Sequence, residues 1–186
     1  DGMDLLSLAD EIEEVLPNSV FLSPNAPFAY DAYDIGYQWF SLSDRSDDKL
    51  SQGVQIALPI LKNYIDENLE LHKLSYKDLV LVGFSQGTMM ALQLAPRLPE
   101  ECFAVIGFSG ALVNPDMLKK EMKSKPAICL IHGAEDPVVP ITQHKLAIRS
   151  FKNMDLSVKD YVIEGLEHSI NHKALRLAKE FLCSKN

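Results

Sequence analysis

The chain has 186 residues, of which 47% are hydrophobic and 24% are charged, and its formal net charge is −8. This composition is ordinary for a single globular domain, and the excess of acidic residues argues against a nucleic-acid partner. No apolar run approaches the roughly 18 residues needed to cross a bilayer, so we expect no integral membrane contact.

The first quarter of the sequence suggests a helix, a short strand and a long aromatic loop. Asp4 is a candidate N-cap for a helix that Pro17 ends, and residues 19–23 form a short apolar run typical of a strand. Residues 25–48 are loop-like and rich in aromatic side chains. A long loop in a compact domain is typical of a functional segment, and the alternative is a hydrophobic flap that only covers the core.

The rest of the chain alternates amphipathic helices with short apolar strands. A helix is expected from residue 47 or 48 to 69, and Pro59 inside it predicts a kink or a division. Further strands are expected at 79–82, 102–108, 126–133 and 156–163, and further helices at 115–122, 142–151 and 171–182. This alternation predicts one α/β domain over 1–186, with a mostly parallel sheet and helices on both faces.

The segment Gly83-Phe84-Ser85-Gln86-Gly87 lies between an apolar strand and an apolar helix. A strand that turns sharply into a helix crowds its own backbone, and we expect both glycines to relieve that crowding. Ser85 would stand at the tip of the turn, beside a helix N-terminus that favours negative charge, which is the nucleophile-elbow arrangement. The alternative is a chance match of a short pattern, against which the flanking strand and helix argue. Ser109 also follows an apolar run, but Ala111 replaces the second glycine there, so we interpret Ser109 as a strand-end residue.

A serine hydroxyl needs a base to act as a nucleophile, and that base is usually a histidine oriented by a carboxylate. In an open parallel sheet, functional groups lie beyond the carboxyl ends of the strands. Asp136 follows the strand that ends near residue 131, and His168 follows the strand that ends near residue 163. The order Ser85, Asp136, His168 is the Ser-acid-His order of α/β hydrolases.

Other residues remain weaker candidates for the base and the acid. His172 lies one helical turn beyond His168, and Glu135 adjoins Asp136, although Asp136 precedes Pro137, which favours a fixed loop. Less favoured are a histidine before the elbow, one that ends a strand, one within a helix and an acid in mid-strand: His72, His132, His144 and Asp160.

The expected reaction follows from these positions. Ser85 Oγ would attack an acyl carbonyl, His168 would carry the proton, and Asp136 would orient the imidazole. The backbone N–H of Gln86, the residue after the nucleophile, would stabilise the oxyanion. The sequence suggests no metal and no organic cofactor.

Five segments, in order along nearly the whole chain, resemble the carboxylesterase/phospholipase family of α/β hydrolases that includes acyl-protein thioesterases. They are Phe21 to Pro27, Gly83 to Gly87, Phe108 to Gly110, His132 to Pro140 and Gly165 to His168. The resemblance implies the α/β-hydrolase fold, a triad of Ser85, Asp136 and His168, and a cytosolic hydrolase of carboxylic esters or thioesters. The segment Gln38-Trp39-Phe40 is similar to the family segment near the acyl pocket, which implies a substrate-binding role for Trp39 and Phe40.

One departure concerns the start of the sequence. Family members carry a strand and a His-Gly-x-Gly type loop before the segment that resembles Asp1 to Leu5. That loop supplies the other oxyanion N–H, and its strand would lie beside the elbow strand. The sequence therefore suggests an N-terminally shortened version of a longer protein, which lacks the N-terminal strand or strands of the fold.

The leading hypothesis is a serine hydrolase acting on a small-molecule, lipid or protein acyl ester. One alternative is a lysophospholipase at membrane surfaces, which the aromatic loop permits and the negative charge disfavours. Another is a non-catalytic acyl-binding relative, favoured by the missing oxyanion loop and disfavoured by the complete triad. The protein could form a homodimer, which the sequence does not decide. The three cysteines, Cys102, Cys129 and Cys183, show no metal-ligand spacing and are odd in number, which favours free thiols in a reducing, cytoplasmic compartment.

Overall fold

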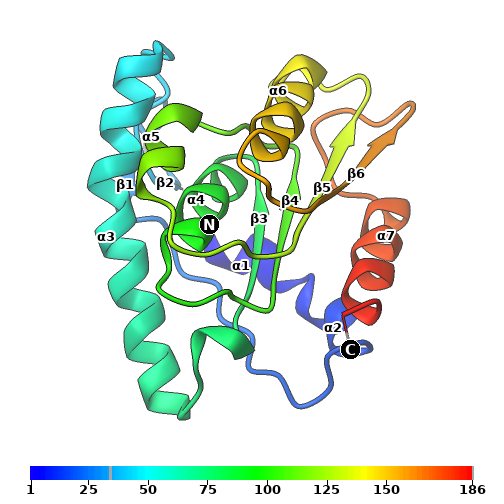
Figure 1. The fold of residues 1–186 in the computed structure, drawn as a ribbon. Helices are drawn as coiled ribbons and strands as arrows, with labels where there is room; N and C mark the ends of the chain where they lie inside the picture. The colour runs from blue at the N-terminus through cyan, green and yellow to red at the C-terminus, as the bar shows by residue number, and fades with distance from the viewer. Residues whose placement is uncertain (34, 186) are drawn as a thin grey trace.

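A computed structural model of the chain describes residues 1–33 and 35–185 (Figure 1). None of the helices in this described part is long and apolar enough to cross a membrane. The elements in chain order are α1 (Gly2–Leu6), α2 (Ala9–Glu13), β1 (Phe28–Ala29), β2 (Tyr37–Gln38), α3 (Asp47–His72), a 3-10 helix (Tyr76–Asp78), β3 (Val80–Phe84), α4 (Gln86–Leu94), a second 3-10 helix (Ala95–Arg97), β4 (Ala104–Phe108), α5 (Pro115–Glu121), β5 (Ile128–Gly133), α6 (Ile141–Lys152), β6 (Val158–Ile163) and α7 (His172–Cys183).

The central sheet of the described chain has four parallel strands in the order β3-β4-β5-β6. Phe84 pairs with Phe108, Phe108 with Ile131, and Gly133 with Ile163, so the carboxyl ends of all four strands lie along one edge. The predicted parallel sheet is confirmed. Its middle strands, β4 and β5, are buried along their whole length, and strands buried on both faces require the continuous apolar runs seen in their sequences.

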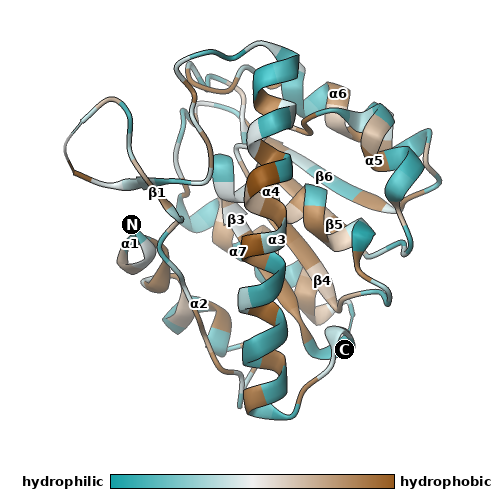
Figure 2. Cartoon of the chain, turned by 90° about the vertical axis from the view of Figure 1, so that its left-hand side faces the viewer, coloured by the Kyte–Doolittle hydropathy of each residue, from teal (hydrophilic) through white to brown (hydrophobic). Residues whose placement is uncertain are grey.

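Two hydrophobic clusters cover the two faces of the sheet. Alternate strand residues point into each cluster, as period-two side chains must: Val105 and Leu130 contribute to one, and Ile106 and Ile131 to the other. Helices α3, α4, α5 and α6 contribute to the first cluster, and α2 and α7 to the second. Brown hydrophobic segments accordingly gather on α4 and the strands in Figure 2. This packing fixes the strand ends that carry the candidate site.

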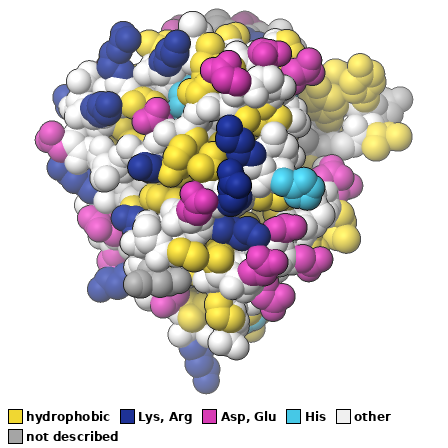
Figure 3. All heavy atoms as spheres, turned by 90° about the vertical axis from the view of Figure 1, so that its right-hand side faces the viewer, with side chains coloured by type: hydrophobic (Ala, Val, Ile, Leu, Met, Phe, Trp, Pro, Cys, Tyr) yellow, Lys and Arg dark blue, Asp and Glu magenta, His cyan; other side chains and the backbone are white. Residues whose placement is uncertain are grey.

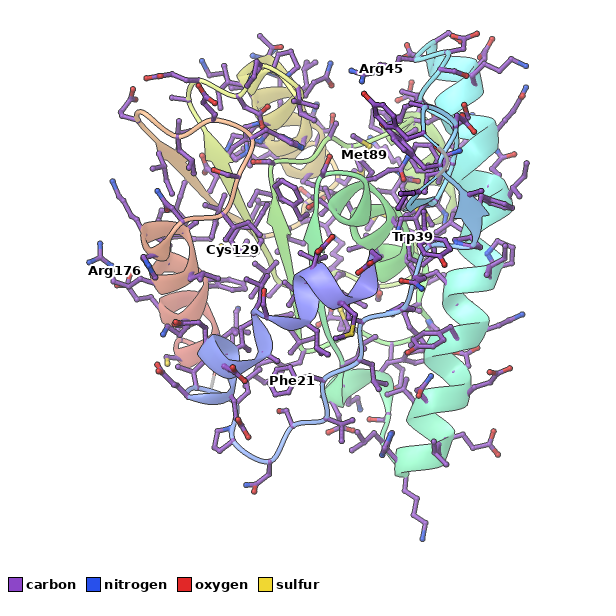
Figure 4. The ribbon with its side chains drawn as sticks, turned by 180° about the vertical axis from the view of Figure 1, so that it is seen from behind. Phe21, Trp39, Arg45, Met89, Cys129 and Arg176 are labelled. Carbon is purple, nitrogen blue, oxygen red and sulfur yellow. The ribbon has the colours of Figure 1, made fainter. Side chains whose placement is uncertain are left out.

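An apolar cavity of about 570 Å³ runs along the outer edge of β3. Leu5 to Pro24, α3 and β3 line it, and Trp39 and Gly87 contribute at the elbow end. Seen from behind, α1 and α2 lie across this side of the sheet (Figure 4). No described strand pairs with the free side of β3.

The N-terminal segment differs from the prediction. The expected single helix is two short ones, and the N-cap is Asp1, whose side chain accepts from the Met3 N–H, while Asp4 completes the capping box. Helix α2 (Ala9–Glu13) carries Asp10 and Glu11 in its first turn, where negative charge is favoured by the helix dipole. Residues 19–23 form no strand; they line the cavity beside β3 without entering its hydrogen-bond ladder.

Pro59 does not divide the helix that contains it. Helix α3 is continuous over 26 residues and is drawn as one long coil in Figure 1. The expectation of a division was wrong because tertiary packing overrides the local cost of proline. Val54, Ala57, Leu61 and Ile65 are buried on both sides of Pro59 and hold the two halves against the core.

Candidate active site

Ser85 occupies the turn between β3 and α4 with an unusual backbone conformation. Its φ is 51° and its ψ is −114°, a region that non-glycine residues avoid and that costs about 1–3 kcal/mol. The strain persists because the turn is tied down on both sides: the Ser85 N–H donates to the Phe108 carbonyl, and the Met89 N–H donates to the Ser85 carbonyl. The predicted strand–turn–helix is present, and it lifts Ser85 to the carboxyl edge of the sheet.

The two glycines of the motif have different surroundings. A Cβ on Gly83 would lie 2.4 Å from the Thr88 nitrogen and 2.5 Å from the Gly87 carbonyl carbon, so the close approach of strand and helix requires glycine there. A Cβ on Gly87 would meet nothing within 4 Å. The expectation that crowding demands both glycines is therefore wrong for Gly87, which lines the apolar cavity instead.

Thr88 links the elbow to the two strands beside it. Its side chain is 1% exposed, and its Oγ1 lies 2.8 Å from the carbonyl oxygens of both Gly83 and Phe108. Gly83 and Phe108 lie at the carboxyl ends of β3 and β4. One hydroxyl thus joins the helix that follows Ser85 to the two strands beside it. Sequence reasoning missed this role, although a lone hydroxyl among the buried residues of α4 needs a partner and was a usable signal.

The Thr88→Val variant is expected to lower the free energy of unfolding by about 1–3 kcal/mol, because it leaves buried carbonyl groups without their hydroxyl partner. Urea denaturation measures this loss. Thr88→Ser keeps the hydroxyl and is expected to lose about 1 kcal/mol, the contribution of one methyl group. Equal stability of Thr88→Val and the unchanged protein would contradict the assigned support.

Asp136 and His168 meet at the carboxyl edge of the sheet. His168 Nδ1 lies 2.8 Å from Asp136 Oδ2, and the other oxygen, Oδ1, accepts from the N–H groups of Val138 and Val139 at 2.8 and 2.9 Å. Burial raises the pKa of Asp136, but the bonds from His168, Val139 and Val138 outweigh burial, so its pKa lies below the usual value. Asp136 is therefore a buried, ionised carboxylate aimed at an imidazole.

The imidazole of His168 lies next to the elbow. The Phe84 ring, directly before Ser85, packs on it with ring centroids 4.7 Å apart. Within the described residues, Ser85 and His168 share no hydrogen bond, and the His168 side chain is 17% exposed. Histidine–nucleophile bonds are often long before substrate binds. The structure thus joins two of the three residues that chain order selected, Asp136 and His168, and packs Phe84, the residue before Ser85, against His168. Glu135 is exposed, and His172 begins α7.

The other candidates lie as the sequence suggested. Ser109 directly follows β4 and is 2% exposed, His144 lies in α6, and the Asp160 side chain in β6 is 46% exposed. His132 is the second-last residue of β5 and is 1% exposed; its Nε2 lies 2.8 Å from the Val139 carbonyl oxygen and 3.4 Å from Asp136 Oδ2. His132 therefore contacts the loop that carries Asp136 and approaches the same carboxylate oxygen as His168.

His144 is a buried base that makes stability depend on pH. It is 2% exposed, its ring lies 5.2 Å from that of His132, and burial lowers its pKa from 6.5 to about 4. Between these pKa values the unfolded chain binds a proton at His144 that the folded chain does not. The contribution of His144 to the free energy of unfolding is therefore fully present above pH 6.5 and is lost as the pH falls toward 4.

We expect the free energy of unfolding to fall by on the order of 3 kcal/mol over that pH interval because of His144. The His144→Leu variant should therefore show a shallower fall in stability between pH 6.5 and 4. Urea denaturation at a series of pH values measures the slope. His72→Leu, at an exposed histidine, is the control and should leave the slope unchanged. An unchanged slope in His144→Leu would refute the assignment.

The predicted acyl-pocket segment lies between β2 and α3. Trp39 is half-buried, lines the apolar cavity and is labelled in Figure 4. Phe40 is 2% exposed and belongs to the core cluster. The preceding hairpin of β1 and β2, described over residues 28–33 and 35–38, forms an arm that extends from the body of the molecule in Figures 2 and 3. Both binding roles stay predictions, and Phe40 already contacts protein with nearly all of its surface.

Within the described residues, no group of three or more histidine, cysteine or acidic side chains could hold a metal ion. The three cysteines are free thiols, of which Cys102 and Cys129 are buried.

Comparison with known proteins gives one consistent result. The sequence profile of the family described as Phospholipase/Carboxylesterase matches residues 1–186. The chain is 26% identical over 147 residues to esterase YpfH of Escherichia coli, covering 79% of this chain and 62% of that relative's length. It is 26% identical over 184 residues to acyl-protein thioesterase 1 of Gibberella zeae, covering 93% of this chain and 77% of the relative. The crystal structure of esterase PE8 superposes with a TM-score of 0.95 at 34% identity and covers all of this chain and 87% of that one.

Proposed function

This chain belongs to the phospholipase/carboxylesterase family of α/β hydrolases, and we propose that it hydrolyses carboxylic esters or thioesters through an acyl-enzyme on Ser85. The observation that carries the proposal is the bond between His168 and Asp136 beside a strained serine turn. Names of relatives, an esterase and acyl-protein thioesterases, support the same class of reaction.

The proposed first step is attack of Ser85 Oγ on the acyl carbonyl carbon. His168 Nε2 takes the hydroxyl proton, while its Nδ1 proton stays bonded to Asp136, whose negative charge stabilises the imidazolium. The tetrahedral oxyanion accepts a hydrogen bond from the Gln86 N–H, which has no partner within α4 because it is the first residue of that helix. Collapse expels the alcohol or thiol, which receives the proton from His168.

In the second half, water attacks the acyl-enzyme carbonyl with His168 again as the base. The carboxylic acid leaves, and Ser85 recovers its proton. The groups follow the carboxyl ends of β3, β5 and β6, which supports a reaction at this edge of the sheet.

Trapping the acyl-enzyme tests this function. We expect p-nitrophenyl acetate to give a burst of nitrophenol, followed by an intact mass increased by one acetyl group that maps to Ser85. Parallel assays with acetyl and octanoyl thioesters separate ester from thioester preference. A folded protein that neither bursts nor acylates would contradict the proposal and would favour the non-catalytic acyl-binding alternative.

The exposed arm favours a second candidate function, hydrolysis of a lipid acyl ester. Phe28, Tyr30, Tyr33, Ile35 and Tyr37 expose between 37% and 86% of their surface. A lysophospholipase would show turnover that rises sharply above the critical micelle concentration of its substrate. Turnover that saturates with monomeric substrate favours a soluble ester or thioester. The free thiols support a reducing, cytoplasmic location as a further part of the proposal.

A further inference from the structure

The side chain of Gln86 joins the nucleophile elbow to a segment far away in the sequence. Its Oε1 accepts from the Trp39 N–H at 2.7 Å, and its Nε2 donates to the Phe40 carbonyl oxygen at 2.6 Å. The two bonds span 47 and 46 residues. They use both the acceptor and the donor end of one planar amide, so they fix the side chain and the backbone at Trp39 and Phe40 together.

The segment that Gln86 holds is anchored on one side only. Phe40 is buried on α3, where a Cβ on Gly53 would lie 2.4 Å from the Phe40 Cβ, so its ring occupies space that only glycine leaves free. On the other side the chain continues into the β1–β2 arm, where Gln38 Nε2 donates to Asp31 Oδ1 at 2.5 Å. Trp39 lies between the core anchor and the arm, and Gln86 is what ties its backbone to the elbow.

Trp39 forms part of the apolar wall of the cavity that extends along β3 to Gly87 in the helix after the proposed nucleophile. Trp39 and Gly87 both line the cavity beside β3, and Gly87 is two residues from Ser85. Gln86 bonds the backbone of Trp39 directly, so movement of the Gln86 side chain would move the indole relative to Ser85. The backbone N–H of the same residue is the oxyanion donor proposed above.

We propose that the Gln86 side chain is a positioning residue that sets the place of Trp39 beside Ser85 and thereby the preference for apolar acyl groups longer than acetyl. This inference rests on the proposed function for its substrate class. A methyl group on the acyl carbonyl does not reach a side wall, whereas a longer chain must contact one. Loss of the clamp therefore weakens binding of long acyl groups more than it weakens the chemistry at the carbonyl.

The chain offers a direct reporter, because Trp39 is its single tryptophan. In Gln86→Met, which keeps an unbranched side chain but has no amide, we expect the Trp39 emission to shift to the red and its quenching by acrylamide to increase. The ratio of kcat/KM for octanoyl over acetyl p-nitrophenyl esters should fall about tenfold, chiefly through a higher KM for the octanoyl ester. Gln52→Met, on an exposed turn of α3, is the matched control and should change neither readout.

A double-mutant cycle tests whether Gln86 acts through Trp39. In a Trp39→Ala background the octanoyl preference should already be lost, and adding Gln86→Met should not lower it further. Melting temperatures of all variants show that they are folded. If Gln86→Met reduces kcat/KM for both esters equally and leaves Trp39 emission unchanged, the proposal is overturned. If the unchanged protein hydrolyses neither ester, the proposed function fails, while the emission of Trp39 still decides whether the clamp exists.

Discussion

Replacement of Ser85 by alanine is expected to lower kcat for ester hydrolysis by about 100,000-fold or more, because the only proposed nucleophile is removed. His168→Ala should cost nearly as much, and the double variant no more than either alone, since the two residues act as one unit. Steady-state hydrolysis of p-nitrophenyl esters by freshly purified variants measures all three. Ser109→Ala, at a buried strand-end serine, is the control and should retain hydrolysis.

The strained backbone at Ser85 predicts a difference in stability between two variants that an unstrained serine would not show. With φ at 51°, the position suits glycine better than any other residue. Ser85→Gly should therefore be inactive and yet more stable than Ser85→Ala, by about 1 kcal/mol in urea denaturation. A Ser85→Gly protein that is less stable than Ser85→Ala would show that the turn stores no strain.

The second large effect is expected at Asp136. Asp136→Asn should lower kcat about 10,000-fold, because the amide favours the wrong tautomer of His168 and cannot stabilise its cation. The fold should survive, since one amide oxygen can still accept from the Val138 and Val139 N–H groups that now bond Oδ1. Steady-state rates of Asp136→Asn are compared with those of Glu135→Gln.

Glu135→Gln is the matched control because Glu135 is the adjacent, exposed carboxylate. It should leave kcat within about twofold of the unchanged protein, as surface charges contribute little. Comparable losses in the two variants would mean that net charge near the site, and not the bond from His168 to Asp136, supports the reaction.

The sequence predicted the parts of this molecule that depend on local pattern. The strands 102–108 and 126–133 were readable because a buried parallel strand needs a continuous apolar run. Asp136 and His168 could be chosen because parallel strands place their carboxyl ends along one edge, and the 2.8 Å contact between them agrees with that placement.

The features that escaped prediction depend on contacts between distant residues. Pro59 stays inside a continuous α3 because core packing on both sides holds the helix. Residues 19–23 have a strand-like composition but no ladder partner within the described chain. The bonds from Gln86 to Trp39 and Phe40 have no sequence signal at all, because two backbone groups more than 40 residues away supply the partners.

Labelling with a fluorophosphonate probe, followed by peptide mapping, tests the central claim most directly, because the probe reacts only with an activated serine. We expect one adduct, on Ser85, which disappears in His168→Ala and becomes much slower to form in Asp136→Asn. Labelling of Ser85 that persists unchanged in His168→Ala, or a folded protein that takes up no probe, would contradict the proposed catalytic site.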